Sequence, residues 1–177
     1  MRILSLIGVL AILGAIAGIV IFFGGFYSVA GTQKDPAIVA WAVTHIREAS
    51  IAHHAPGTPP ISLDDPAVVQ AGARAFAAHG CANCHGGPGV PWAKFSEGLN
   101  PSPPDLKEVA PGLTPGEIFW VVKNGIRMTG MPGFRAIGDQ ELWSIAAFLR
   151  KLPIISNEDY KTWSTSPAAE GPAPTIQ

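Results

Sequence analysis

Cysteine is scarce in this chain of 177 residues, which contains only Cys81 and Cys84. A disulfide framework needs several pairs of cysteines, so the chain is not a small secreted domain of that type. The two cysteines also leave no spare thiol for a zinc site or for a resolving partner in redox chemistry. All thiol chemistry must therefore lie in one short segment of the chain.

Charged residues are also few, at 14% of the chain, and the formal net charge is −1. The 12 Lys and Arg residues are scattered and form neither a basic run nor a basic patch with interleaved aromatic residues. This distribution lacks the electrostatic footprint of a nucleic-acid-binding protein, so we expect no nucleic-acid partner. It also provides no strongly positive face that would steer a charged partner over long range.

A long apolar run is present from Ile3 to Phe23, and Ser5 is its only polar side chain. At about 1.5 Å per helical residue the run spans about 31 Å, which matches a bilayer hydrocarbon core of about 30 Å. Ser28-Val29-Ala30 resembles the cleavage site of a signal peptide, but the apolar cores of signal peptides usually have only about 7–15 residues. We therefore expect residues 1–31 to form a retained transmembrane anchor.

Residues 32–62 are expected to form a helix and a proline-rich linker. Pro36 suits the first turn of a helix, and apolar residues recur from there to about Ala52. The adjacent residues His53 and His54 suggest a metal site, but neighbouring positions on a helix point about 100° apart and chelate poorly. We favour a solvated histidine pair.

Capping signals predict three helices in the main domain, residues 63–153. Asp65-Pro66 and Thr114-Pro115 each place a capping residue before a proline at the first helical position. Glu117 completes a capping box with Thr114, and Asp139 is expected to cap the last helix. The predicted helices cover residues 66–78, 115–124 and 140–151.

Two stretches lack helical periodicity. Residues 86–112 are rich in Gly and Pro, and a loop of this length is unusual in a compact domain unless a cofactor supplies the missing core. Residues 154–177 lose the apolar pattern, and the last dozen are mostly small residues and prolines. We expect this second stretch to be a flexible tail.

The segment Cys81-Ala82-Asn83-Cys84-His85 is the attachment signature of a c-type haem. Its two thiols can form thioether bonds to the two vinyl groups of one haem, and the imidazole of His85 then becomes an axial ligand of the iron. The alternative, a thioredoxin-type dithiol motif, needs a βαβ context, and strand-like alternation is absent nearby. We predict one covalent haem c.

A low-spin haem needs a second axial ligand, commonly Met or His. Met128 and Met131 are the methionines beyond the N-terminus. Pro132 disfavours helical geometry at Met131, and the glycines at 130 and 133 let the backbone pass close to a porphyrin face. Two methionines that merely fill a core are the alternative. We favour Met131 as the ligand.

Residues 63–153 resemble a class I cytochrome c. The resemblance implies an all-α fold whose first and last helices cross beside the haem, and it places Gly72 and Phe76 against Trp143 and Phe148 at that crossing. The residues that carry the resemblance are Gly72, Phe76, Cys81, Cys84, His85, Pro104, Leu106, Gly125, Ile126, Gly130, Met131, Pro132 and Trp143.

The resemblance also implies contacts around the haem. The carbonyl of Pro104 would accept a hydrogen bond from the axial imidazole, with Pro103, one residue away, as the alternative acceptor. Trp92 and Trp120 would pack against the haem rather than relay electrons. Arg127 would either approach a haem propionate or be solvated.

A haem with both His and Met ligands is coordinatively saturated, so we expect single-electron transfer and no small-molecule substrate. The anchor and the helix that precedes the haem domain resemble those of membrane-anchored bacterial cytochromes c. This resemblance implies a single-pass protein of the cytoplasmic membrane with its haem domain in the periplasm. Its partners would be redox proteins. The alternatives are a tightly bound subunit of a membrane oxidase or dehydrogenase, and a haem sensor or peroxidase with a dissociable sixth ligand.

Overall fold

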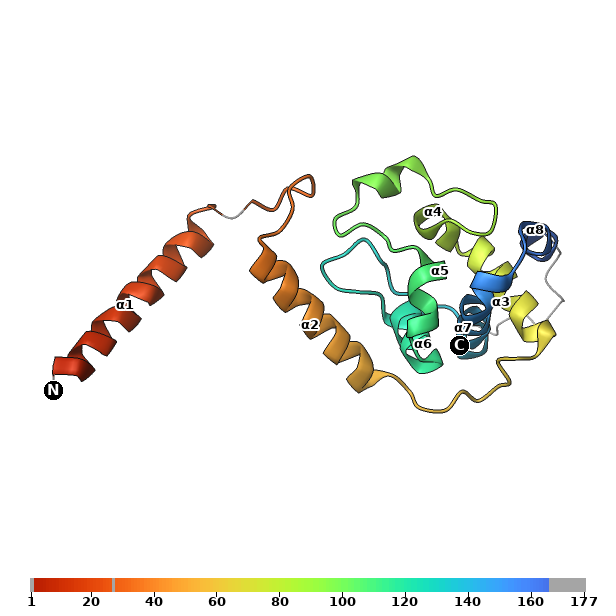
Figure 1. Cartoon of the computed structure of the whole chain (residues 1–177), viewed down its shortest axis with the longest axis horizontal. Helices are drawn as coiled ribbons and strands as arrows, with labels where there is room; N and C mark the ends of the chain where they lie inside the picture. Colours follow the sequence, from red (N-terminus) through yellow and green to blue (C-terminus); the bar gives the residue numbers. More distant parts are fainter. Residues whose placement is uncertain (1, 27, 166–177) are drawn as a thin grey trace. The chain divides into compact units, whose positions relative to one another are not determined.

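The computed structural model describes residues 2–26 and 28–165, and these residues form helices with no β-strand among them (Figure 1). The chain divides into two units, Met1–Lys34 and Asp35–Gln177. The all-α fold expected from the sequence is confirmed. The last dozen residues of the expected tail, 166–177, lie outside the described residues.

The first unit contains helix α1, Arg2–Phe23. An 18-residue window of α1 has a mean hydropathy of 2.9 and none of the helix residues is buried, so by length and composition α1 can cross a membrane. A signal sequence near an N-terminus has the same properties. The helix thus fits either of the two interpretations weighed above.

The second unit begins with α2, Ala37–His54, which extends two residues beyond the predicted end at Ala52. Its C-terminal part packs on α6, Pro115–Asn124. Ile51 is buried there, and the ring of His54 stacks on Trp120 at 5.7 Å between centroids. The segment expected to be a helix and linker therefore packs on the main domain.

The core of the second unit lies between α3, Pro66–Ala78, and α7, Asp139–Lys151, which Figure 1 shows packed together with α8. A hydrogen bond and an ion pair join the end of each helix to the start of the other. His79 contacts Glu141 at 2.9 Å, and Lys151 contacts Asp64 at 2.6 Å. The two helices therefore run antiparallel. These exposed pairs contribute little to the free energy of unfolding, because such pairs typically contribute about 0–1 kcal/mol.

The remaining elements are short. They are α4 (Cys81–His85), η1 (Lys94–Gly98), α5 (Leu106–Val109), η2 (Ala110–Gly112), η3 (Leu152–Ile154) and α8 (Asn157–Thr165). Three of them, η1, α5 and η2, lie within the stretch 86–112 that was expected to be irregular.

The predicted helix starts hold for α3 and α6 but not for α7. The Asp65 side chain accepts from the Ala67 N–H at 2.8 Å, and the Thr114–Glu117 capping box is formed. The expectation that Asp139 caps α7 is wrong, because Gly138 occupies that position and Asp139 is the first helical residue. The carboxylate of Asp139 instead accepts from Lys123 Nζ at 2.6 Å, which ties α7 to α6.

The two long core helices touch at Gly72. A Cβ at this position would overlap the backbone carbonyl of Ser144 and approach the Cβ of Phe148 to 2.8 Å. The rings of Phe76 and Phe148, both fully buried, lie 5.3 Å apart beside this contact. Trp143 turns toward α6 and stacks on Phe119 with the ring centroids 4.3 Å apart.

A helix closes the core where a flexible tail was expected. The expectation is wrong for residues 157–165, which form α8. Tyr160 is 2% exposed, and its ring stacks on Phe148 at 5.7 Å and meets Phe76 edge-on at 6.4 Å. Ser156 caps the helix by accepting from the Asp159 N–H at 3.0 Å.

Gly72→Ala is predicted to lower the free energy of unfolding by about 1–3 kcal/mol, because the added methyl forces α3 and α7 apart. Gly112→Ala is the matched control, since a Cβ there meets nothing within 4 Å. Urea unfolding of the detergent-solubilised chain measures both. Equal effects of the two substitutions would contradict the close approach.

Tyr160→Ala is predicted to lower the free energy of unfolding by about 3 kcal/mol or more, because it removes a buried ring from the aromatic cluster. Tyr160→Phe keeps the ring contacts and should cost much less. The exposed neighbour Lys161 provides a second control, Lys161→Ala. If Tyr160→Ala unfolds at the same urea concentration as the unsubstituted chain, α8 does not contribute to the core.

Candidate functional site

The segment that carries the two thiols forms the five-residue helix α4, Cys81–His85. It lies between Gly80 and Gly86, which have φ angles of 72° and 67°. Cys81 and Cys84 are three residues apart and so lie on one face of the helix. Both thiols are free of disulfides and half-buried. The helix therefore presents two thiols and, directly after them, an imidazole.

Burial raises the pKa of the Cys81 thiol to about 11, and the neighbouring Cys84 thiol adds to the increase. The thiol of Cys81 is therefore protonated at neutral pH. A reactive dithiol motif works through a thiolate whose pKa is lowered below the usual value near 8.5. The environment of Cys81 has the opposite effect on the pKa of its thiol.

The imidazole of His85 is oriented by a backbone carbonyl. Its Nδ1 lies 3.0 Å from the carbonyl oxygen of Pro104. Because a carbonyl only accepts, Nδ1 carries a proton, and in the neutral ring the lone pair is then on Nε2. An imidazole held in this way is the form that ligates a metal. The partner is Pro104 rather than its neighbour Pro103.

The loop with the candidate second ligand is closed by hydrogen bonds. Met131 accepts from the Ile126 N–H at 3.2 Å and donates its own N–H to Thr129 Oγ1 at 3.1 Å. Thr129 Oγ1 in turn donates to the Ile126 carbonyl at 2.8 Å. Both backbone polar groups of Met131 are therefore fixed from within the loop.

The same loop folds back onto the end of α6. A Cβ at Gly125, where φ is 68°, would lie 2.6 Å from the backbone N of Gly133. The Phe134 N–H donates to the Val122 carbonyl at 3.1 Å. Gly125 is therefore required both for its left-handed backbone and for the close approach of the returning chain.

The two methionines of the loop differ in exposure. Met128 has a left-handed backbone, with φ at 61°, and is 78% exposed. Met131 is half-buried. Only Met131 is thus both held by the loop and partly enclosed, which fits a ligand better than Met128 does.

The other three candidate residues, Trp92, Trp120 and Arg127, have different surroundings. Trp92, which is 54% exposed, lines a small hollow of about 160 Å³ beside His85. Trp120 stacks on His54 of α2, so one face of the Trp120 ring is covered and cannot contact a cofactor. His53 and His54 are both exposed, as expected for a solvated pair, and His54 additionally stacks on Trp120. Arg127 is exposed.

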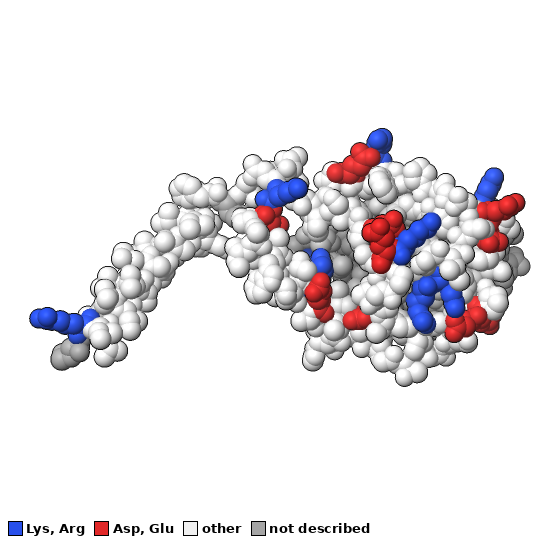
Figure 2. Space-filling view, in the orientation of Figure 1, with Lys and Arg blue, Asp and Glu red and all other residues white. Residues whose placement is uncertain are grey.

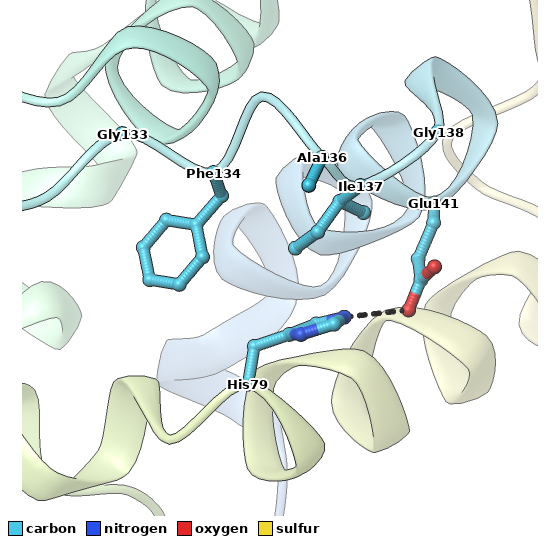
Figure 3. A pocket seen from close by; sticks show the side chains of 7 residues that line it. All are labelled: His79, Gly133, Phe134, Ala136, Ile137, Gly138 and Glu141. Atoms are coloured by element: carbon cyan, nitrogen blue, oxygen red, sulfur yellow. Dashed lines mark hydrogen bonds and ion pairs between the residues drawn. The ribbon is translucent and has the colours of Figure 1, made fainter.

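A larger hollow of about 560 Å³ lies elsewhere, between the end of α3 and the start of α7 (Figure 3). Phe134 and Ile137 line it, and the His79–Glu141 hydrogen bond lies across it. It contains none of the predicted haem ligands. Among residues 2–26 and 28–165, no group of three or more His, Cys, Asp or Glu side chains could hold a metal ion. Because its lining includes none of Cys81, Cys84, His85 and Met131, this hollow is not the candidate site.

The donor set fits a c-type haem. The chain presents two thiols on one short helix, an imidazole with its Nε2 free and a thioether on a closed loop. Val90, Trp92 and Phe95 follow α4 and are 43%, 54% and 62% exposed, although each has a large apolar side chain. A cofactor in this region would cover apolar surface that the protein itself leaves open.

Comparison with protein families adds one match. Residues 67–149 match the model of a family described as cytochrome C oxidase, cbb3-type, subunit III. The matched segment begins in the first turn of α3 and ends in the last turn of α7, so it includes α4 and the Met131 loop and leaves out α1, α2 and α8. Neither the curated proteins nor the solved structures contain a match.

Met131→Ala is predicted to abolish the weak near-infrared charge-transfer band of a Met-ligated ferric haem. It should also lower the reduction potential and open the iron to external ligands, because the thioether is lost. Met128→Ala, three residues away in the same loop, is the matched control and should leave the band in place. The reverse pattern would assign the ligand to Met128.

Proposed function

We propose that this chain is a membrane-anchored mono-haem cytochrome that passes single electrons between membrane redox partners. The match of residues 67–149 to a cytochrome c oxidase subunit family supports a haem-containing electron carrier. The observation that carries the proposal is the pair of prepared axial donors. His85 is oriented by Pro104 with Nε2 free, and Met131 is held on a closed loop.

Each residue of the site has a distinct role in this proposal. Cys81 and Cys84 hold the haem through thioether bonds, and His85 and Met131 occupy the axial positions. The haem supplies one-electron chemistry, since its iron cycles between the ferrous and ferric states. The Pro104 carbonyl keeps the His85 ring in one orientation and increases its basicity, as outer-shell hydrogen bonds do at metal sites.

The two axial donors also separate the candidate functions. A sensor or peroxidase needs one axial position that opens to a ligand or substrate. Here the hydrogen bonds to Ile126 and Thr129 fix the Met131 backbone, and Gly125 anchors the loop on α6. This rigidity supports a saturated iron and hence electron transfer without a bound substrate.

Helix α1 supports anchoring in a membrane, and we place the haem domain on the periplasmic side because bacterial cytochromes c carry their haem outside the cytoplasmic membrane. The name of the matched family favours a second candidate, in which the chain is a tightly bound subunit of a membrane oxidase complex. Mild detergent extraction followed by size analysis separates a free carrier from a complex subunit.

The surface charge supports transient docking of a redox partner without attraction to a single strongly charged patch. Figure 2 shows Lys and Arg side chains interspersed with Asp and Glu over the visible face of the second unit. Several of these charges are paired, among them Lys94 with Glu97 at 3.3 Å. Partner binding should therefore weaken only modestly with salt, because mixed charges create little long-range attraction.

Covalent attachment tests the proposed function. The chain, produced in a bacterium able to mature cytochromes c, should keep its haem on the polypeptide after acid–acetone extraction. It should be reduced and reoxidised as a low-spin haem and remain in the membrane fraction. The double variant Cys81→Ser/Cys84→Ser should release all of its haem, since both thioethers are lost.

Two results would contradict the proposal. Haem extracted from the unsubstituted chain would rule out covalent attachment. An oxidised spectrum that is high-spin at neutral pH would instead indicate an open axial position and favour the sensor or peroxidase.

A further inference from the structure

The exposed apolar side chains of the second unit form two main groups. One group surrounds the candidate haem site and includes Val90, Trp92 and Phe95. The other lies on the N-terminal half of α2, where Ile38, Trp41, Val43 and Ile46 are 69%, 59%, 40% and 69% exposed. The haem and its redox partners account for the first group. Nothing in the proposed function accounts for the second.

Three members of this group, Ile38, Trp41 and Ile46, lie on one face of the helix, whereas Val43 points about 140° away from Ile38. Positions 38, 41, 42, 45 and 46 have the spacing that places side chains on a common helix face. Residues 37–46 contain no Asp, Glu, Lys or Arg. The polar residue on this face, His45, lies against the Trp41 ring at 4.6 Å, and its Nδ1 is 2.9 Å from the Trp41 carbonyl. We call positions 38, 41, 42, 45 and 46 the outer face of α2.

The opposite side of α2 is already attached to the domain. Ile51 is buried, and His54 stacks on Trp120 of α6. Just beyond the helix, the backbone of Pro56 lies so close to Gly116 that a Cβ on Gly116 would overlap its carbonyl. These contacts fix the C-terminal part of α2, so its outer face cannot turn inward to join the core of the same unit.

The position and composition of the outer face point to a lipid surface. Only residues 24–36 separate α1 from α2, and at about 3.4 Å per extended residue they reach at most about 45 Å. Tethering at this range holds the face near the bilayer at a high effective concentration, so a weak contact suffices. Trp suits the membrane interface, where its apolar ring and polar N–H meet different surroundings.

We propose that the outer face of α2 lies in the headgroup region of the bilayer, and that this contact orients the cytochrome domain on the membrane. The inference rests on the proposed anchoring by α1. Because α2 is fixed to α6, and α6 leads directly into the Met131 loop, a lipid contact at α2 determines which side of the haem domain faces away from the membrane.

The test uses the full haem-loaded chain in liposomes and two variants that each add one cysteine, Ile38→Cys and Ala40→Cys. The two positions are exposed, lie at nearly the same distance from the anchor and point about 200° apart around the helix. Each variant is labelled with an environment-sensitive fluorophore, and quenching by brominated phospholipid is measured. Flotation confirms that the chain is in the liposomes, and the unsubstituted chain must take up no label if both native thiols are bonded to haem.

The label at position 38 should be quenched several-fold more strongly than the label at position 40. Absence of quenching at position 38 in a chain that floats with the liposomes would overturn the lipid contact while leaving the anchor intact. Equal quenching at both positions would overturn the proposed face. A chain that does not float would refute the anchoring, and labelling of the unsubstituted chain would refute haem attachment instead.

Discussion

The contact between Gly72 of α3 and the Ser144 carbonyl of α7 determines how the rest of the second unit can be arranged. Without a side chain at Gly72 the two helices approach until backbone meets backbone, and Phe76 and Phe148 interlock beside the contact. The end of α3 then leads into α4 and fixes where the thiols and His85 lie. The start of α7 likewise fixes where the chain after the Met131 loop must arrive. One helix crossing thus places both proposed axial donors, although neither belongs to it.

Much of this arrangement follows from local signals in the sequence. The starts of α3 and α6 are specified by Asp65 and by the Thr114–Glu117 capping box, whose hydrogen bonds the structure contains. The all-helical fold was equally predictable, and the spacing of Cys81, Cys84 and His85 predicts haem attachment, since spacing and periodicity are properties of short windows of sequence. Local rules suffice wherever the partner of a residue lies within a turn of the same element.

The expectations that were wrong involve partners distant in the sequence. Helix α8 has little apolar periodicity, and Tyr160 is its buried residue. Tyr160 is buried because its ring packs on Phe148 and Phe76. Asp139 was expected to cap its own helix, but the nearby ammonium group of Lys123 binds its carboxylate instead. The stacking of His54 on Trp120 joins two segments that are far apart in the sequence. In each case a tertiary contact outweighs the local preference, which single-sequence reasoning does not detect.

The aromatic cluster of Phe76, Phe148 and Tyr160 also has a consequence for the order in which the protein is made. A chain is synthesised from its N-terminus, so Phe76 and the thiols of α4 emerge well before the rings that will cover Phe76. Until residues 148–160 have followed, α3 has no completed core to join, because its principal contacts are non-local and such contacts form late. The segment Cys81–His85 therefore passes through an interval in which it is already synthesised and still accessible. During that interval an enzyme that attaches haem would meet an open chain rather than a closed fold.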